Sequence, residues 1–224
     1  MADRYVNIPI TLLRTLHIDS KSFFNDAFDV GIYLYSKTLE GNELKRYKDA
    51  LKYLGITQIS PAAGIRNAKD VLSNIPNNYP TTGIETDILF NYYKSAKSEF
   101  EIICLAAFLA IKSIIGKKHF DKTNKAMIHA RMFGYNTPKE MPQDLSEAQK
   151  KYKIRYHMDK LLEELQLNWH LKVTWNHNRG FYVSFDLTLE QLAALMIKGN
   201  RQTKLKQLKE EKARAIEKAL ATAS

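Results

Sequence analysis

An unbroken run of ten apolar residues, 102–111, lies near the middle of the 224-residue chain, between Glu101 and Lys112. A helix that is apolar on every side needs other elements packed all around it. Ten residues are too few to span a bilayer, which takes roughly 20. We therefore expect residues 99–115 to form a helix, ended by Gly116, at the centre of a packed core, and we expect no membrane partner.

Apolar residues at helical spacing mark three helices before this run. They are followed by helix-stopping glycines or preceded by a capping serine and a proline. After a turn rich in Asn and Pro, residues 84–93 alternate loosely between apolar and polar and indicate a strand. The predicted helices are 22–40, 43–54 and 60–75.

The second half repeats this order of elements. Gly-ended helices match those of the first half at offsets of 75 and then 79 residues, which suggests an internal duplication. The pattern predicts a mainly α protein with small β-hairpins, an α+β class, built from two tandem modules, 1–95 and 96–187. A basic helix, 188–224, closes the chain, with a break expected at Gly199–Asn200. The predicted elements of the second module are helices 99–115, 121–133 and 146–166 and a hairpin of strands 169–175 and 181–185.

The positive charge is concentrated in the second half. The formal net charge is +10; residues 1–100 hold 12 Lys and Arg against 11 Asp and Glu, so nearly all of the excess lies beyond residue 100. One-sided basic charge is typical of proteins that bind polyanions, because each cation near a phosphate releases a counterion. A solvated basic surface without a ligand is the alternative.

Three segments of the second half carry a resemblance to a known family. They are NKAMIHARMFGY (124–135), YKIRYHMDKLLEELQLNWHLKV (152–173) and WNHNRGFYVSF (175–185). A helix ending in glycine, a basic helix and a hairpin with a charged tip resemble the winged helix-turn-helix superfamily of DNA-binding proteins. Two such modules in tandem are similar in architecture to plasmid replication initiators. The loop 134–146 departs from the pattern, because it is much longer than a tight helix-turn-helix turn.

On a single helix over 148–165, Ile154, Met158, Leu161, Leu162 and Leu165 gather on one side and are expected to be buried. The opposite, exposed face is predicted to enter the major groove of duplex DNA. An ordinary amphipathic helix with a solvated basic face remains the alternative. The predicted contact residues are Gln149, Tyr152, Lys153, Tyr156 and Lys160, with Arg155 on the flank and Lys150 and Lys151 at the start to meet phosphates.

The hairpin tip, His177–Asn178–Arg179, is expected to lie against phosphate or in a minor groove. Lys122, Lys125 and Arg131 near the second helix are predicted backbone clamps, or equally solubilising charges. The first module offers fewer cations, and its acidic residues would repel phosphate, so we expect it to serve dimerisation or a second half-site. The basic tail is open to three interpretations: a solvated helix, a phosphate-binding arm or a dimer contact.

No enzyme class finds support in the sequence. The six histidines form no tight metal-binding pair, and no phosphate-binding GxxxxGK[ST] or dinucleotide GxGxxG motif occurs. The single cysteine, Cys104, falls inside the apolar run and is expected to be an inert buried thiol. A tyrosine nucleophile would need a clustered Arg/His set or a metal, and none can be assembled. We therefore expect no catalysis, cofactor, metal or small-molecule ligand.

The sequence thus predicts a non-catalytic protein that binds duplex DNA, either as a transcriptional regulator or in origin recognition, with a homodimer as one open alternative for its assembly. Residues 1–19 lack the apolar segment of a secretory signal, so we expect a cytoplasmic protein. Two alternatives remain. One is an interaction module whose basic face meets an acidic protein; the other is an RNA-binding protein that stacks bases on Tyr152 and Tyr156.

Overall fold

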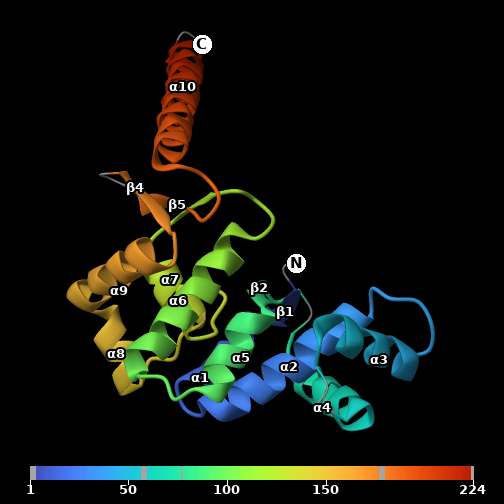
Figure 1. Ribbon diagram of the computed structural model, residues 1–224. Coiled ribbons are helices and arrows are strands. Elements are labelled where there is room, and N and C mark those ends of the chain that lie inside the picture. The colour runs from blue at the N-terminus through green and yellow to red at the C-terminus, as the bar shows by residue number, and fades with distance from the viewer. Residues whose placement is uncertain (1–3, 57–59, 77, 177–179, 223–224) are drawn as a thin grey trace.

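The computed structural model describes residues 4–56, 60–76, 78–176 and 180–222, and the fold is mainly helical with two small antiparallel sheets (Figure 1). The expected α+β class is therefore confirmed. The strands are β1 (Tyr5–Pro9), β2 (Thr81–Glu85), β3 (Asp121–Thr123), β4 (Lys172–Asn176) and β5 (Gly180–Ser184). The helices are α1 (Leu13–Leu16), α2 (Ser20–Ser36), α3 (Glu43–Leu54), α4 (Pro61–Ser73), α5 (Thr86–Lys94), α6 (Glu99–Ile115), α7 (Lys125–Met132), α8 (Glu147–Lys153), α9 (Arg155–Asn168) and α10 (Leu189–Thr222), with short 3-10 turns at Ile10–Leu12 and Pro138–Glu140.

Helix α6 is the central element, as its apolar run predicts. Every residue from Ile103 to Ile111 is buried, and Gly116 ends the helix. A capping box of Ser98 and Glu101 begins it by satisfying free amides of the first turn. Helix α6 packs against α7 and α9 on the side of the second half and against β2 on the side of the first (Figure 1). The buried core consequently runs through both halves of the chain.

The strand predicted over 84–93 is wrong for most of its length. Strand β2 ends at Glu85, and residues 86–94 form helix α5. Phe90 and Tyr93, one helical turn apart, both pack on Phe28 of α2, with ring centroids 4.7 Å and 6.1 Å away. This tertiary contact favours the helix over a short alternation that the sequence leaves ambiguous.

The first half also lacks the hairpin that the repeat predicts. Strand β2 pairs instead with β1 at the start of the chain, from Tyr5↔Glu85 to Pro9↔Thr81. Sequence periodicity did not indicate β1, because its partner is about 75 residues away and long-range pairing leaves no local signature.

The second half contains the predicted hairpin, β4–β5, and a third strand that was not predicted. Strand β3 occupies the start of the region expected to be helix 121–133, and it pairs with β5, so that the sheet order is β3-β5-β4. Asn124 caps the shorter helix α7 that follows. Gly134 follows α7 with a φ of +78°, as expected of a glycine that ends a helix.

The helix predicted over 146–166 is two helices. Ile154 has an extended backbone (φ −68°, ψ 131°) that separates α8 from α9. The break turns α9 relative to α8, and a helical wheel drawn through both assigns residues to the wrong side.

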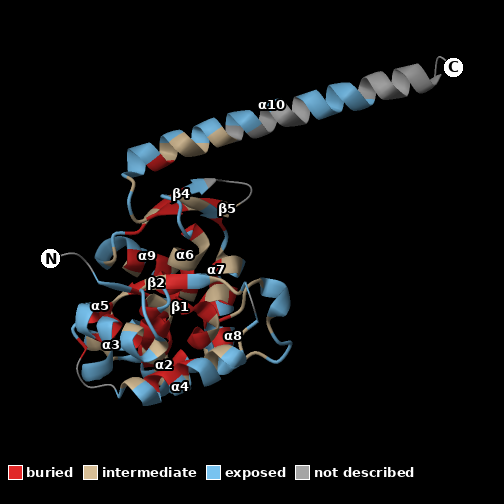
Figure 2. Ribbon diagram, turned by 90° about the vertical axis from the view of Figure 1, so that its right-hand side faces the viewer, coloured by how far each residue is buried: buried red, intermediate tan, exposed pale blue. Residues whose placement is uncertain are grey.

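Helix α10 continues through Gly199–Asn200, where the sequence suggested a break. Its first turns lie on β4 and β5 and bury Leu192 completely. An added Cβ on Gly199 would lie 3.1 Å from the Tyr182 hydroxyl oxygen, so the helix passes close to that side chain. Beyond this contact α10 extends away from the body (Figures 1 and 2). Among the described residues, no helix combines the length and the apolar character needed to cross a bilayer.

Candidate nucleic-acid interface

Gln149 and Tyr152, expected on an exposed face, are buried. The Gln149 side chain completes the capping box of Ser146 at the start of α8, and its backbone carbonyl accepts a hydrogen bond from His129 Nε2 at 2.8 Å. Tyr152 is 3% exposed, whereas Ile154, expected in the core, is 56% exposed. The predicted exposure was wrong because it assumed one continuous helix over 148–165, whereas the backbone turns at Ile154.

Most of the predicted contact residues of the broken helix are exposed. Lys153 ends α8, Tyr156 is 69% exposed in the first turn of α9, and Lys160 is exposed one turn later. The Lys160 ammonium lies 5.7 Å from the centre of the Phe100 ring. Lys153 makes no hydrogen bond or ion pair with any residue that the structure describes, so its charge is free for a ligand.

Other predicted cations of this region carry acidic partners. Lys150 pairs with Glu147 at 3.1 Å, and Lys151 pairs with Glu99 at 3.0 Å. These partners are exposed, and surface pairs of this kind are worth about 0–1 kcal/mol, so a phosphate can displace them.

Asp159 of α9 joins two of the predicted contacts. Its carboxylate forms one ion pair with Lys125 of α7 and another, at 3.4 Å, with Arg155. The Arg155 side chain is nevertheless 88% exposed. The three side chains therefore leave a net charge of +1 at the place where α7 and α9 meet.

The middle of the α9 face is not uniformly basic. Asp159 and Glu163 stand there beside Tyr156 and the exposed Leu167. The positive charge is therefore concentrated in the first turns of α9 and at the end of α8. No side chain caps the N-terminus of α9, and its first turn, which the structure describes fully, holds no acidic residue. A helix N-terminus of this kind carries partial positive charge.

Arg131 does not stand free as a phosphate clamp. Its Nε and Nη2 donate to the backbone and side-chain oxygens of Asn136, both at 2.8 Å, and Nη1 donates to Ser113 Oγ at 3.3 Å. The guanidinium thus ties the loop after α7 to α6.

Lys125 and Lys122, both predicted to contact DNA, lie on opposite faces of the β3-β5-β4 sheet. Trp175 of β4 is 49% exposed, and the Lys125 ammonium lies 5.4 Å from its ring centre. Lys122 pairs in register with Tyr182, and its ammonium lies 6.0 Å from that ring, on the face that α10 covers. The predicted tip residues His177, Asn178 and Arg179 lie outside the described residues.

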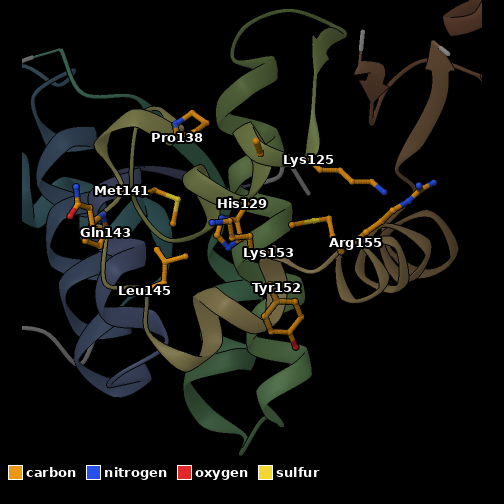
Figure 3. A pocket seen from close by; sticks show the side chains of 12 residues that line it. Lys125, His129, Pro138, Met141, Gln143, Leu145, Tyr152, Lys153 and Arg155 are labelled. Atoms are coloured by element: carbon orange, nitrogen blue, oxygen red, sulfur yellow. The ribbon is translucent and has the colours of Figure 1, made fainter. Parts of the chain in front are cut away.

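A cavity of about 620 Å³ opens between the long loop after α7 and the junction of α8 and α9 (Figure 3). Loop side chains such as Met141 and Leu145 line one side; Lys125 and Arg155 lie at the other, with His129 and Lys153 between them. The sequence did not predict this cavity. The signal in the sequence was the loop 134–146, which is too long for a tight turn and which carries apolar residues such as Met141 and Leu145 among polar ones.

Two histidines, the buried His129 and the half-buried His17, make stability depend on pH. Burial lowers the pKa of His129 and of His17, whose Nε2 lies 3.0 Å from the Met132 carbonyl oxygen. Near and below pH 6.5 these two imidazoles therefore bind more protons in the unfolded chain than in the folded one. The free energy of unfolding consequently falls as the pH drops from 7 towards 5. The slope is at most about 1.4 kcal/mol per pH unit for each histidine. Urea unfolding at pH 7 and 5.5 should show this loss, and it should be smaller in His17→Gln and His129→Gln; equal losses in all three proteins would contradict the assignment.

Cys104 is buried, as expected, and desolvation raises the pKa of its thiol to about 12. Among the described residues, no group of His, Cys, Asp and Glu has the arrangement of a metal site.

Comparison with protein families, with curated proteins and with solved structures found no match to this chain.

Proposed function

We propose that the second half of the chain binds duplex DNA without catalysis. The observation that carries the proposal is the meeting of Lys125, Lys153 and Arg155, from three different helices, beside the exposed Trp175. These residues, with Tyr156 and Lys160, define what we call the α7–α9 face. Its cations are placed to contact phosphates, and its exposed first turn of α9 is placed to approach base edges.

The order of elements supports a winged-helix interpretation of this half. Helix α6 is followed by strand β3, helix α7, the α8–α9 pair and the β4–β5 hairpin, and β3 joins the sheet beside β5. Helix α9 leads directly into the hairpin, as a recognition helix leads into a wing. The uncapped N-terminus of α9 adds a second reason to expect a phosphate there, because free backbone amides and the helix dipole both favour an anion.

The structure changes the proposed set of contacts. Gln149 and Tyr152 are left out because they are buried, and Arg131 because Asn136 and Ser113 hold its guanidinium. Lys150 and Lys151 remain as phosphate contacts that first exchange an acidic partner. Lys122 lies on the α10 side of the sheet, so we assign it to a contact shared with that helix. Transcriptional regulation and origin recognition both fit this activity. The first half of the chain is then the other module of the tandem pair.

Fluorescence anisotropy with a labelled duplex of random sequence across a salt series tests the proposal. Four phosphate contacts from the α7–α9 face give a slope of log K against log salt of about −3.6, and contacts by α10 make it steeper. A slope near zero, or no binding at low salt, would overturn the proposal. Tighter binding of a single-stranded RNA of equal length would favour the RNA-binding alternative instead.

Removal of residues 201–224 should lower DNA affinity about tenfold for every sequence and make the salt slope less negative. The deleted segment holds seven Lys and Arg against three Glu, and the described side chains within it, such as Arg201, Lys209 and Arg214, are exposed. Sequence-independent phosphate contacts weaken binding uniformly when they are lost. Anisotropy measures the affinity, and sedimentation gives the native mass; a halved mass would identify α10 as a dimer contact instead.

A further inference from the structure

We propose that the cavity between the loop after α7 and the α8–α9 junction binds an amphiphilic anion, a small molecule with an apolar body and a carboxylate or sulfonate group. Its volume of about 620 Å³ lies within the usual range for small-molecule sites. It is bounded by α7, the loop after it and the α8–α9 junction, three successive parts of residues 125–158 that fold back on one another, so no single loop builds the cavity (Figure 3).

One side of the cavity is apolar and can pack against the apolar body of such a ligand. Two of its apolar lining residues, Met141 and Met158, are methionines, whose flexible thioethers adapt to ligands of different shape. The apolar lining is formed by Ala126, Pro138, Met141, Pro142, Leu145 and Met158.

The charge of the lining selects an anion. Lys125, Lys153 and Arg155 line the cavity, and no Asp or Glu does so among the described residues. Asp159 lies nearby and offsets one positive charge through its contacts with Lys125 and Arg155. Lys153 has no such partner and stands close enough to His129 that its charge helps to lower the pKa of that imidazole. An anionic group on the ligand would therefore meet a net positive charge, while a cationic amphiphile would be repelled.

The same cations belong to the α7–α9 face. A ligand that engages Lys125, Lys153 and Arg155 withdraws them from phosphate, so the anion and DNA should compete. This competition rests on the proposed function, whereas binding of the anion does not.

Isothermal titration calorimetry with decanoate, without DNA, tests the site. Decyltrimethylammonium, with the same chain length and the opposite charge, and sulfate, with charge and no chain, are the comparison ligands. We expect one decanoate per chain, at least tenfold weaker binding of the cation and no measurable binding of sulfate. Equal affinity for decanoate and decyltrimethylammonium, or no decanoate binding, would overturn the proposal.

Two variants locate the binding. Ala126 is exposed on α7, so Ala126→Trp fills the mouth of the cavity without disturbing the core, and we expect at least tenfold weaker decanoate binding. Lys153→Met removes the unpartnered cation and should weaken decanoate about tenfold. Ala62→Trp on α4 and Lys52→Met on α3, both exposed, are the matched controls, with circular dichroism to verify folding. Wild-type affinity in Ala126→Trp would place decanoate elsewhere and refute the site.

A final measurement separates this site from the proposed function. Decanoate added to the protein–duplex complex should raise the apparent Kd for DNA in the wild type and not in Ala126→Trp. If decanoate binds in the cavity and DNA affinity does not change, the ligand site stands and the competition is refuted.

Discussion

Duplex DNA should bind roughly 100-fold more weakly, and with a salt slope about 1.8 closer to zero, when Lys153 and Arg155 are both replaced by alanine. Each lost phosphate contact removes about 0.9 from the slope, and about tenfold per contact corresponds to about 1.4 kcal/mol. Lys153 has no described partner, and the Arg155 side chain is 88% exposed, so neither replacement removes a buried contact. Anisotropy titrations at several salt concentrations measure both quantities.

The control must remove the same charge elsewhere. Lys45 and Lys52 are exposed on α3 of the first half, and their double alanine variant lowers the net charge by the same two units. We expect it to leave the salt slope within about 0.5 of wild type, because the slope counts phosphate contacts rather than net charge. Similar losses in both double variants would show that binding is diffuse and does not involve the α7–α9 face.

Gly134→Ala should lower the free energy of unfolding by about 3 kcal/mol. Gly134 has a φ of +78°, which costs an L-residue about 1–2 kcal/mol, and crowding adds about 1–3 kcal/mol. An added Cβ would lie 2.6 Å from Arg14 Cγ, 2.9 Å from the Arg14 backbone nitrogen and 3.0 Å from the Ile10 carbonyl oxygen. Backbone atoms cannot move aside easily, so urea unfolding should show a large decrease in the midpoint.

Gly55→Ala separates the two costs. Gly55 also has a left-handed backbone, with a φ of +71°, but a Cβ there would meet only the flexible end of the Arg4 side chain. We expect a loss of about 1 kcal/mol. If both variants lose the same amount, the close approach of α1 to Gly134 contributes nothing to stability.

Gly134 matters because it is where the two halves of the chain meet. Arg14 Nε donates to the Gly134 carbonyl oxygen at 3.2 Å, and the Arg14 guanidinium carbon lies 4.6 Å from the centre of the Tyr135 ring. Tyr79 Oη also donates to the Glu140 carboxylate at 2.9 Å. These contacts hold both ends of the loop segment that leads to the cavity wall, so the first half positions part of the candidate site.

The sequence by itself determined the features that depend on local pattern. The apolar run over 102–111 required a central helix, Gly116 and Gly134 marked helix ends, and the alternation around the Asn176–Gly180 turn required a hairpin. It also located the excess charge in the second half. Each of these follows from side-chain polarity at a fixed period or from a residue with special backbone freedom, which are properties of a short segment alone.

The tertiary structure decided whatever depends on which segments meet. Residues 86–94 became a helix because Phe90 and Tyr93 pack on Phe28, and β1 became a strand because β2 pairs with it. The turn at Ile154 buried Tyr152, exposed Ile154 and brought Lys153 and Arg155 next to Lys125. Contacts between distant segments carry no local periodicity, and one residue of extended backbone is enough to change which side chains a helix presents to solvent.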